Sequence, residues 1–294
     1  MTKPVNVIRK AKALKIITNI FTYFILIFAA FLILGPFYVV IITSLKTRVD
    51  AMSESFTLFP KTIDIHGYKE VFAYTSGAGD TIPTIVRGFI NTLIVSLPTS
   101  IIGTLISALA AFSFSKINFK SKRTLFAVLL GTMMIPGTIS MIPSYILFDK
   151  IGWVDTFLPL IVPGLLGGAS SVFFLRQFFF SVPDELIDAA KIDGLGYFGI
   201  FFNIMIPLSI PALIAQFVLA FVGSYNAYMG PLIYLQTPTK YTLQIALRFF
   251  QSTNGTDYAV LMAGAVVSLI PTLIIYLFGQ RYFIDGIATT GLKI

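Results

Sequence analysis

Residues 16–43 read IITNIFTYFILIFAAFLILGPFYVVIIT, a run without a single charged side chain. A helix needs about 20 consecutive apolar residues to cross the hydrocarbon core of a bilayer. The run is too long for the core of a signal peptide, and no small-residue cleavage site follows it. We therefore expect a retained membrane-spanning helix here and an integral membrane protein overall.

The composition of the whole chain agrees with this interpretation. Of its 294 residues, 56% are hydrophobic and 12% are charged, whereas soluble domains carry about 25% charged residues. The window 197–239 is too long for one span, and we place its helix near 208–231. The result is an all-α bundle of six transmembrane helices. The further uncharged windows are 88–115, 124–148, 156–175, 197–239 and 258–280.

The distribution of charge orients this bundle. Residues 1–15 carry five basic residues and no acid, and such a cluster stays in the cytoplasm. Six spans then place both termini inside, with thirteen basic and five acidic residues on that side and eight of each outside. The net charge of +8 thus follows the membrane rather than a nucleic-acid surface. The expected segments are a basic terminus 1–15 and a membrane domain 16–294, with external stretches at about 45–87 and 231–257 and an inner loop at about 180–207.

Several kinds of chemistry have no residues to support them. The six windows contain no acidic or basic side chain, which argues against a proton-driven carrier, although backbone carbonyls can still hold sodium. The sequence has no phosphate-binding loop and no nucleophile motif. It has no cysteine, and its one histidine, His66, is expected to be a solvated external residue. We predict no metal site, no cofactor on this chain and no enzymatic activity.

Prolines and glycines within the spans predict bent and closely packed helices. Proline removes a backbone donor and bends its helix, which can serve shape alone or a gated cavity. Gly164 and Gly168 form a G-x-x-x-G pattern that permits close helix approach.

A short charged segment, PDELIDAAKIDG at residues 183–194, predicts an inner helix of roughly ten residues. Ser181 is the expected N-cap, the acidic residues suit the positive end of the helix dipole, and Gly194 is placed to end the helix. Ala189 and Ala190 form a slim side that could enter a groove on a partner. The alternative is an ordinary amphipathic helix that lies on its own bundle.

The spacing of this segment resembles a family signature. Asp188-Ala189-Ala190, Gly194, Ile204 and Pro207 resemble the E-A-A-x-x-x-G-x9-I-x-L-P pattern of permease subunits in binding-protein-dependent ABC importers. Asp188 stands where glutamate is usual, and Ile206 stands where leucine is usual. Further segments resemble the carbohydrate-uptake branch, and within it the shorter maltose-type permease. These are Ser44-Leu45-Lys46, Asn91-Thr92, the run FLRQFF at 174–179 and the run YNAY at 225–228.

The resemblance implies a division of labour between several chains. Two cytoplasmic ATPase subunits would bind ATP and magnesium, a second permease would complete the pore as a heterodimer, and an external solute-binding protein would deliver the solute. The location would be the inner membrane of a bacterial or archaeal cell, surrounded by membrane lipid. The expected ATPase-coupling residues are Glu185, Leu186, Asp188, Ala189, Ala190, Asp193, Gly194 and Pro207.

Two further residue sets are candidates for the solute route. Polar residues of the fifth span could line a sugar path or simply join helices, and we favour the second role. They are Gln216, Ser224, Tyr225, Asn226 and Tyr228. By resemblance, the long external segment reaches toward the binding protein, and its candidate contacts are Tyr241, Gln244, Arg248 and Asn254.

The sequence thus predicts the membrane subunit of an ATP-driven importer for sugars or oligosaccharides. Three alternatives stay open: a sodium-driven secondary carrier, a scaffolding membrane subunit, and an ABC permease for a solute other than sugar.

Overall fold

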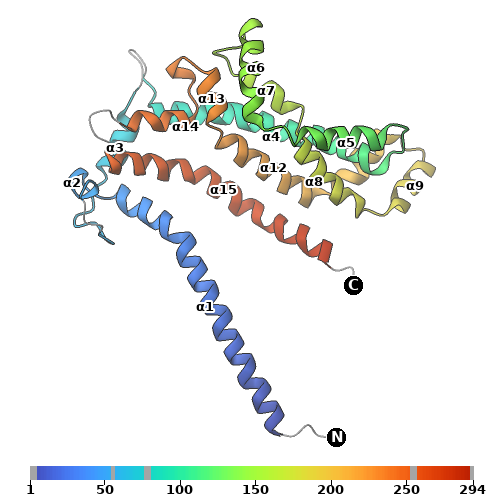
Figure 1. Ribbon diagram of the computed structural model, residues 1–294, viewed down its shortest axis with the longest axis horizontal. Coiled ribbons are helices and arrows are strands. Elements are labelled where there is room, and N and C mark those ends of the chain that lie inside the picture. Colours follow the sequence, from blue (N-terminus) through green and yellow to red (C-terminus); the bar gives the residue numbers. More distant parts are fainter. Residues whose placement is uncertain (1–4, 54–56, 76–80, 252–256, 292–294) are drawn as a thin grey trace. The chain divides into compact units, whose positions relative to one another are not determined.

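The computed structural model describes residues 5–53, 57–75, 81–251 and 257–291, with side chains from residue 14 to residue 280 within those ranges. The regular structure of the described residues is helical (Figure 1). The chain divides into two compact units, one formed by residues 1–70 with 252–266 and the other by residues 71–251 with 267–294.

The first unit holds the N-terminal helix and the short helices that follow it. In helix α1 (Val5–Ser44), no residue of the most apolar 18-residue window is buried by the rest of the chain, so the apolar surface of this window faces lipid or a partner. The short α2 (Arg48–Ala51) and the start of α3 (His66–Ala73) follow. Gly67 lies so close to α15 (Tyr258–Gly291) that an added Cβ would sit 2.6 Å from the carbonyl oxygen of Ala259.

The second unit is built around α4 (Thr84–Lys116), which packs against α7 (Leu158–Leu165), α8 (Ala169–Phe180) and α12 (Ile210–Tyr225). An added Cβ on Gly103 of α4 would lie 2.5 Å from the carbonyl oxygen of Gly164. The close approach predicted for Gly164 is therefore present. Gly168 also meets α4, because its N–H donates to the Ser107 hydroxyl at 3.3 Å, although it has room for a side chain. Gly167, which the pattern does not include, has a φ of +77° and lies so close to α4 that an added Cβ would have no room.

The six predicted spans appear as four long helices and two bent pairs. The long ones are α1, α4, the α7–α8 segment and α15. Helix α5 (Lys122–Thr132) meets α6 (Gly137–Lys150) at 91°, and the segment Tyr197–Leu208 meets α12 at 83°. Six spans result if each pair crosses once. The helix expected near 208–231 is wrong in its bounds, because the chain bends at Ser209, beside Pro211, and α12 ends at Tyr225.

Shorter helices complete the second unit, and they occupy the two loops that the sequence singled out. The loop predicted to be inner contains α9 (Asp184–Ile192), α10 (Tyr197–Ile200), a π-helical turn (Phe201–Met205) and α11 (Ile206–Leu208). The segment predicted to be outer, called the outer segment below, contains α13 (Met229–Tyr234), η2 (Pro238–Lys240), α14 (Leu243–Ala246) and η3 (Leu247–Phe250).

Candidate functional site

Helix α9 begins two residues later than a Ser181 cap would allow. Pro183 precedes the helix in an extended backbone conformation, and no side chain caps the first turn. The hydroxyl of Ser181 instead donates to the carbonyl oxygen of Phe178 at 2.7 Å. The predicted N-cap is therefore wrong, because Ser181 belongs to the end of α8 rather than to the start of α9.

Lys116, at the end of α4, fixes the start of α9. Its Nζ donates to the carbonyl oxygen of Val182 and to Oδ1 of Asp184, both at 2.6 Å. The lysine side chain is 4% exposed and the aspartate 78% exposed. The hydrogen bond and the charge of Lys116 hold the pKa of Asp184 below its ordinary value. This contact ties the inner helix to the central helix of the bundle.

The end of α9 agrees with the prediction for Gly194. Gly194 has a φ of +85°, a conformation that glycine adopts at little cost. Its N–H donates to the carbonyl oxygen of Lys191 at 3.0 Å, and the N–H of Leu195 donates to that of Ala190 at 2.9 Å. These two bonds form a Schellman motif, which gives the helix a sharp and defined end.

The two faces of α9 differ in their surroundings. Ile187 and Ala190 are each 3% exposed and join a hydrophobic core with Phe112, Phe179 and Met205. The expectation that both alanines form one accessible side is corrected for Ala190, which points into its own protein. The outward face carries five exposed residues: Glu185, Leu186, Ala189, Ile192 and Asp193.

This outward face is partly apolar. Leu186 is 43% exposed and Ile192 is 87% exposed, and both flank Ala189 at helical spacing. Asp188 is exposed too and pairs with Lys191 at 2.9 Å. Pro207 lies exposed in the first turn of α11. The sequence reasoning missed Ile192, although its position three residues after Ala189 would have placed it on the same face.

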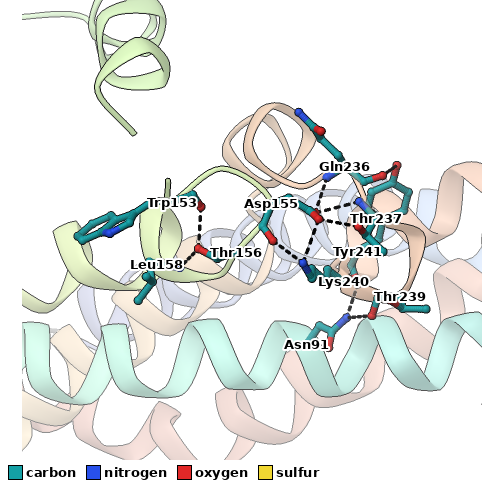
Figure 2. A network of polar contacts seen from close by, with 10 residues as sticks. All are labelled: Asn91, Trp153, Asp155, Thr156, Leu158, Gln236, Thr237, Thr239, Lys240 and Tyr241. Atoms are coloured by element: carbon teal, nitrogen blue, oxygen red, sulfur yellow. Dashed lines mark hydrogen bonds and ion pairs between the residues drawn. The ribbon is translucent and has the colours of Figure 1, made fainter. Parts of the chain in front are cut away.

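On the side predicted to be outer, Asp155 holds the segment 236–240 in place (Figure 2). Its carboxylate accepts hydrogen bonds from the N–H groups of Gln236 and Thr237, both at 2.9 Å, and from the Thr237 hydroxyl at 2.6 Å. Lys240 Nζ donates to Oδ2 of Asp155 at 2.9 Å and to its carbonyl oxygen at 2.6 Å. We call this group of four residues the outer clasp.

The electrostatics of the outer clasp favour a charged carboxylate. Partial burial alone would raise the pKa of Asp155, but hydrogen bonds from Thr237, Gln236 and Lys240 outweigh this effect and lower the pKa below its ordinary value. Asp155 also has a φ of +58°, a region that aspartate and asparagine tolerate better than other side chains with a Cβ. No local pattern predicts this site, because its partners lie about 80 positions apart in the sequence.

The Asn91-Thr92 pair anchors the same outer segment to α4. The side-chain amide of Asn91 donates to the carbonyl oxygens of Thr239 and Tyr241, at 3.0 and 2.9 Å (Figure 2). The Thr92 hydroxyl accepts the N–H of Leu243 at 2.8 Å. Two adjacent polar residues of α4 thus satisfy backbone groups of the outer segment.

Beyond these anchors the outer segment is hollowed by a pocket of about 290 Å³. Tyr241 stacks on Phe249 with ring centroids 5.8 Å apart, and Arg248 is exposed at the same pocket. Gln244 donates instead to Oδ1 of Asn226 at 3.2 Å. Of the predicted binding-protein contacts, Tyr241 and Arg248 thus lie together, Gln244 lies against α12, and Asn254 falls outside the described residues.

The polar residues of the fifth span separate into two kinds. Gln216 is buried and donates to the Ser171 hydroxyl at 2.7 Å, and buried Tyr225 donates to the carbonyl oxygen of Ser268 at 3.1 Å. Both join helices. Asn226 is exposed and Tyr228 is half-buried.

Ser224 lies at a cavity of about 260 Å³ between α4, α7, α8 and α12. Its hydroxyl lies 3.3 Å from that of Thr99. Thr104 and Ser171 also line the cavity, together with three glycines of the α7–α8 segment. Thr104 is 5% exposed, and its hydroxyl finds no hydrogen-bond partner among the described residues. The sequence reasoning named Ser224 alone of this group.

Sequence comparison places these features in a known context. Residues 103–288 match the family model described as binding-protein-dependent transport system inner membrane component. The chain is 32% identical over 268 residues to the arabinooligosaccharides transport system permease protein AraQ of Halalkalibacterium halodurans, covering 90% of this chain and 93% of that one. It is 30% identical to the lactose transport system permease protein LacG of Rhizobium radiobacter, covering 91% and 94%.

Structural comparison gives the same fold. A chain from the crystal structure of a bacterial ABC transporter involved in the import of the acidic polysaccharide alginate superimposes with a TM-score of 0.78 at 22% identity, covering 91% of this chain and 96% of that one. The alginate transporter in complex with its alginate pentasaccharide-bound periplasmic protein superimposes with a TM-score of 0.67 at 14% identity, covering 92% and 95%.

Proposed function

Because the chain belongs to the family of binding-protein-dependent transport system inner membrane components, we propose that it is the membrane subunit through which an ATP-driven importer takes up oligosaccharides. The chain is a transport subunit and not an enzyme. ATP and magnesium belong to separate ATPase subunits, a second permease completes the pore, and an external protein delivers the solute. Both termini lie in the cytoplasm.

The observation that carries the coupling role is the two-faced geometry of α9. Its inner face is fixed to the bundle by Ile187, Ala190 and the bond from Lys116. Its outer face leaves Leu186 and Ile192 exposed. A short helix held rigidly on one side can pass the closing motion of a bound ATPase to the helices behind it. An ordinary loop helix would instead cover its own apolar residues.

The proposed substrate class rests on relatives whose names specify arabinooligosaccharides, lactose and melibiose, raffinose or stachyose. The cavity at Ser224 suits such solutes, because neutral hydroxyl groups bind sugar hydroxyls without charge. The proposed substrate class also agrees with the absence of acidic and basic side chains from the predicted spans.

Uptake by the assembled transporter tests this function. The chain would be reconstituted in vesicles with its second permease, its ATPase and its binding protein, and labelled oligosaccharides would be supplied outside. We expect accumulation only when ATP is supplied on the side of the vesicle membrane that carries the ATPase and when the binding protein is present. Accumulation by this chain alone under a sodium gradient would instead support the secondary-carrier alternative.

A milder prediction concerns Thr104. Thr104→Val removes a hydroxyl that has no partner among the described residues, so the bundle should keep its thermal stability. If this hydroxyl bonds to the solute, losing that bond costs about 1 kcal/mol. The transport rate at low solute concentration should then fall roughly fivefold. The control is Ser113→Ala on the same helix, whose hydroxyl bonds to the carbonyl oxygen of Leu109. Equal transport by both variants would remove Thr104 from the solute path.

A further inference from the structure

Three basic side chains gather where the end of α4, the start of α5 and the end of α8 meet. The charges of Arg176 and Lys116 both act on Lys122, and the one acidic charge that acts there is that of Asp184. Within the described residues, Asp184 is the only carboxylate that pairs with any of them, and it pairs with Lys116. Lys120 and Arg123 lie exposed beside Lys122. The site therefore carries a clear excess of positive charge.

The protein orients Arg176 and Lys122 without neutralising them. Arg176 Nε donates to the carbonyl oxygen of Phe114 at 3.0 Å, and its guanidinium carbon lies 3.8 Å from the ring centroid of Phe126 and 4.5 Å from that of Phe180. Lys122 Nζ donates to the carbonyl oxygen of Ser115 at 3.1 Å. No described acceptor bonds to the two terminal nitrogens of Arg176. A guanidinium held in this way presents a planar fork that matches a phosphate group.

Apolar side chains continue from this charged group along α5. Leu125 is 50% exposed and Val128 is 61% exposed, and Phe180 is 48% exposed on α8. Helix α5 belongs to one of the bent pairs that are apolar enough to cross a membrane, and in such a span Leu125 and Val128 would face hydrocarbon. The positive charge matches the anionic headgroup of a phospholipid, and the apolar surface directly beside it matches the acyl chains.

We propose that Lys122 and Arg176 bind the phosphate headgroup of an anionic phospholipid whose acyl chains lie against Leu125 and Val128. Basic sites between transmembrane helices near a membrane surface bind anionic headgroups in this manner. A free phosphate could use the same cations, but it would leave the apolar surface without a role. The proposal is independent of the solute and of the docking role of α9.

The experiment is native mass spectrometry of the purified, assembled transporter with phosphatidylglycerol or phosphatidylcholine. We expect the wild-type complex to retain phosphatidylglycerol several-fold better than phosphatidylcholine, and the Lys122→Gln/Arg176→Gln double variant to lose this preference and retain the two lipids about equally. Lys150→Gln, an exposed lysine at the far end of the same bent pair, is the matched control and should keep it. Arg176→Lys should keep part of it.

Three outcomes would overturn the proposal. The first is equal retention of both lipids by the wild-type complex, which needs no variant and so does not depend on folding. The second is complete loss of phosphatidylglycerol in millimolar inorganic phosphate, which would mark a site for a free anion. The third is a double variant that keeps the wild-type lipid preference in the mass spectra but releases the ATPase in phosphatidylcholine nanodiscs. This result would mark a contact with a protein.

Discussion

Ala189→Arg is expected to abolish ATP-driven uptake while leaving the membrane subunit folded. Ala189 lies exposed at the centre of the outward face of α9, flanked by Leu186 and Ile192. A long charged side chain there would hold an ATPase groove away from both apolar residues. Loss of a central contact costs about 2 kcal/mol or more at protein interfaces, so association should weaken by at least about thirtyfold.

Co-purification of the ATPase and uptake by reconstituted vesicles measure this effect. Ala73→Arg, at an exposed alanine that ends α3, is the matched control and should leave both unchanged. Normal uptake by the Ala189→Arg transporter would refute the docking face, whatever the solute proves to be.

The neighbouring alanine should respond in the opposite way, and this contrast tests the orientation of α9. Ala190 is 3% exposed within the core formed with Phe112, Phe179 and Met205. Ala190→Leu overfills that space, which typically costs about 1–3 kcal/mol. We expect a lower midpoint of thermal unfolding for Ala190→Leu and an unchanged one for Ala189→Arg. The reverse result would mean that the helix turns its other side inward.

The sequence predicted those features that local patterns determine. Apolar windows located the spans, because crossing a bilayer requires a long uncharged run. Gly194 ended α9 as expected, because a left-handed position at a helix end favours glycine regardless of distant contacts. Asn91 and Thr92 were noticed as a motif, but their hydrogen bonds reach residues 239–243 and were not foreseen.

Features that depend on distant residues escaped prediction. The start of α9 is fixed by Lys116, 68 residues before Asp184, while Ser181 satisfies its hydroxyl within α8. A polar residue close to a helix start is therefore insufficient evidence for a cap. The bends within two windows were suggested by prolines, but neither their angles nor the end of α12 at Tyr225 could follow from hydropathy alone.

Asp155→Asn is expected to loosen the outer clasp. Asparagine has nearly the same shape and tolerates the left-handed backbone at this position, so the substitution removes mainly charge. It leaves one oxygen to accept the bonds from Gln236, Thr237 and Lys240 that two oxygens now accept. Hydrogen bonds to a charged group contribute about 1.5–3 kcal/mol each, and we expect a loss of stability of about that size.

Hydrogen exchange of the backbone N–H groups in the outer segment measures this loss directly. Protection of Gln236 and Thr237 should fall by about tenfold or more, since roughly 1.4 kcal/mol corresponds to a factor of ten. Asp149→Asn is the matched control, because Asp149 is exposed at the end of α6 and makes no described side-chain bond. Unchanged protection in Asp155→Asn would show that Asn91 and Thr92 hold the segment without the clasp.

The same carboxylate predicts a specific pH dependence. Its pKa is lower in the folded protein than in the unfolded chain, so its stabilising effect is complete above the unfolded value of about 3.9 and is lost as the pH falls below it. The contribution of Asp155 to protection of the outer segment should therefore stay constant between about pH 5 and pH 8. Below about pH 4 the wild-type protein should lose protection and approach Asp155→Asn. A wild-type loss centred near pH 6 would assign the titration to a different group.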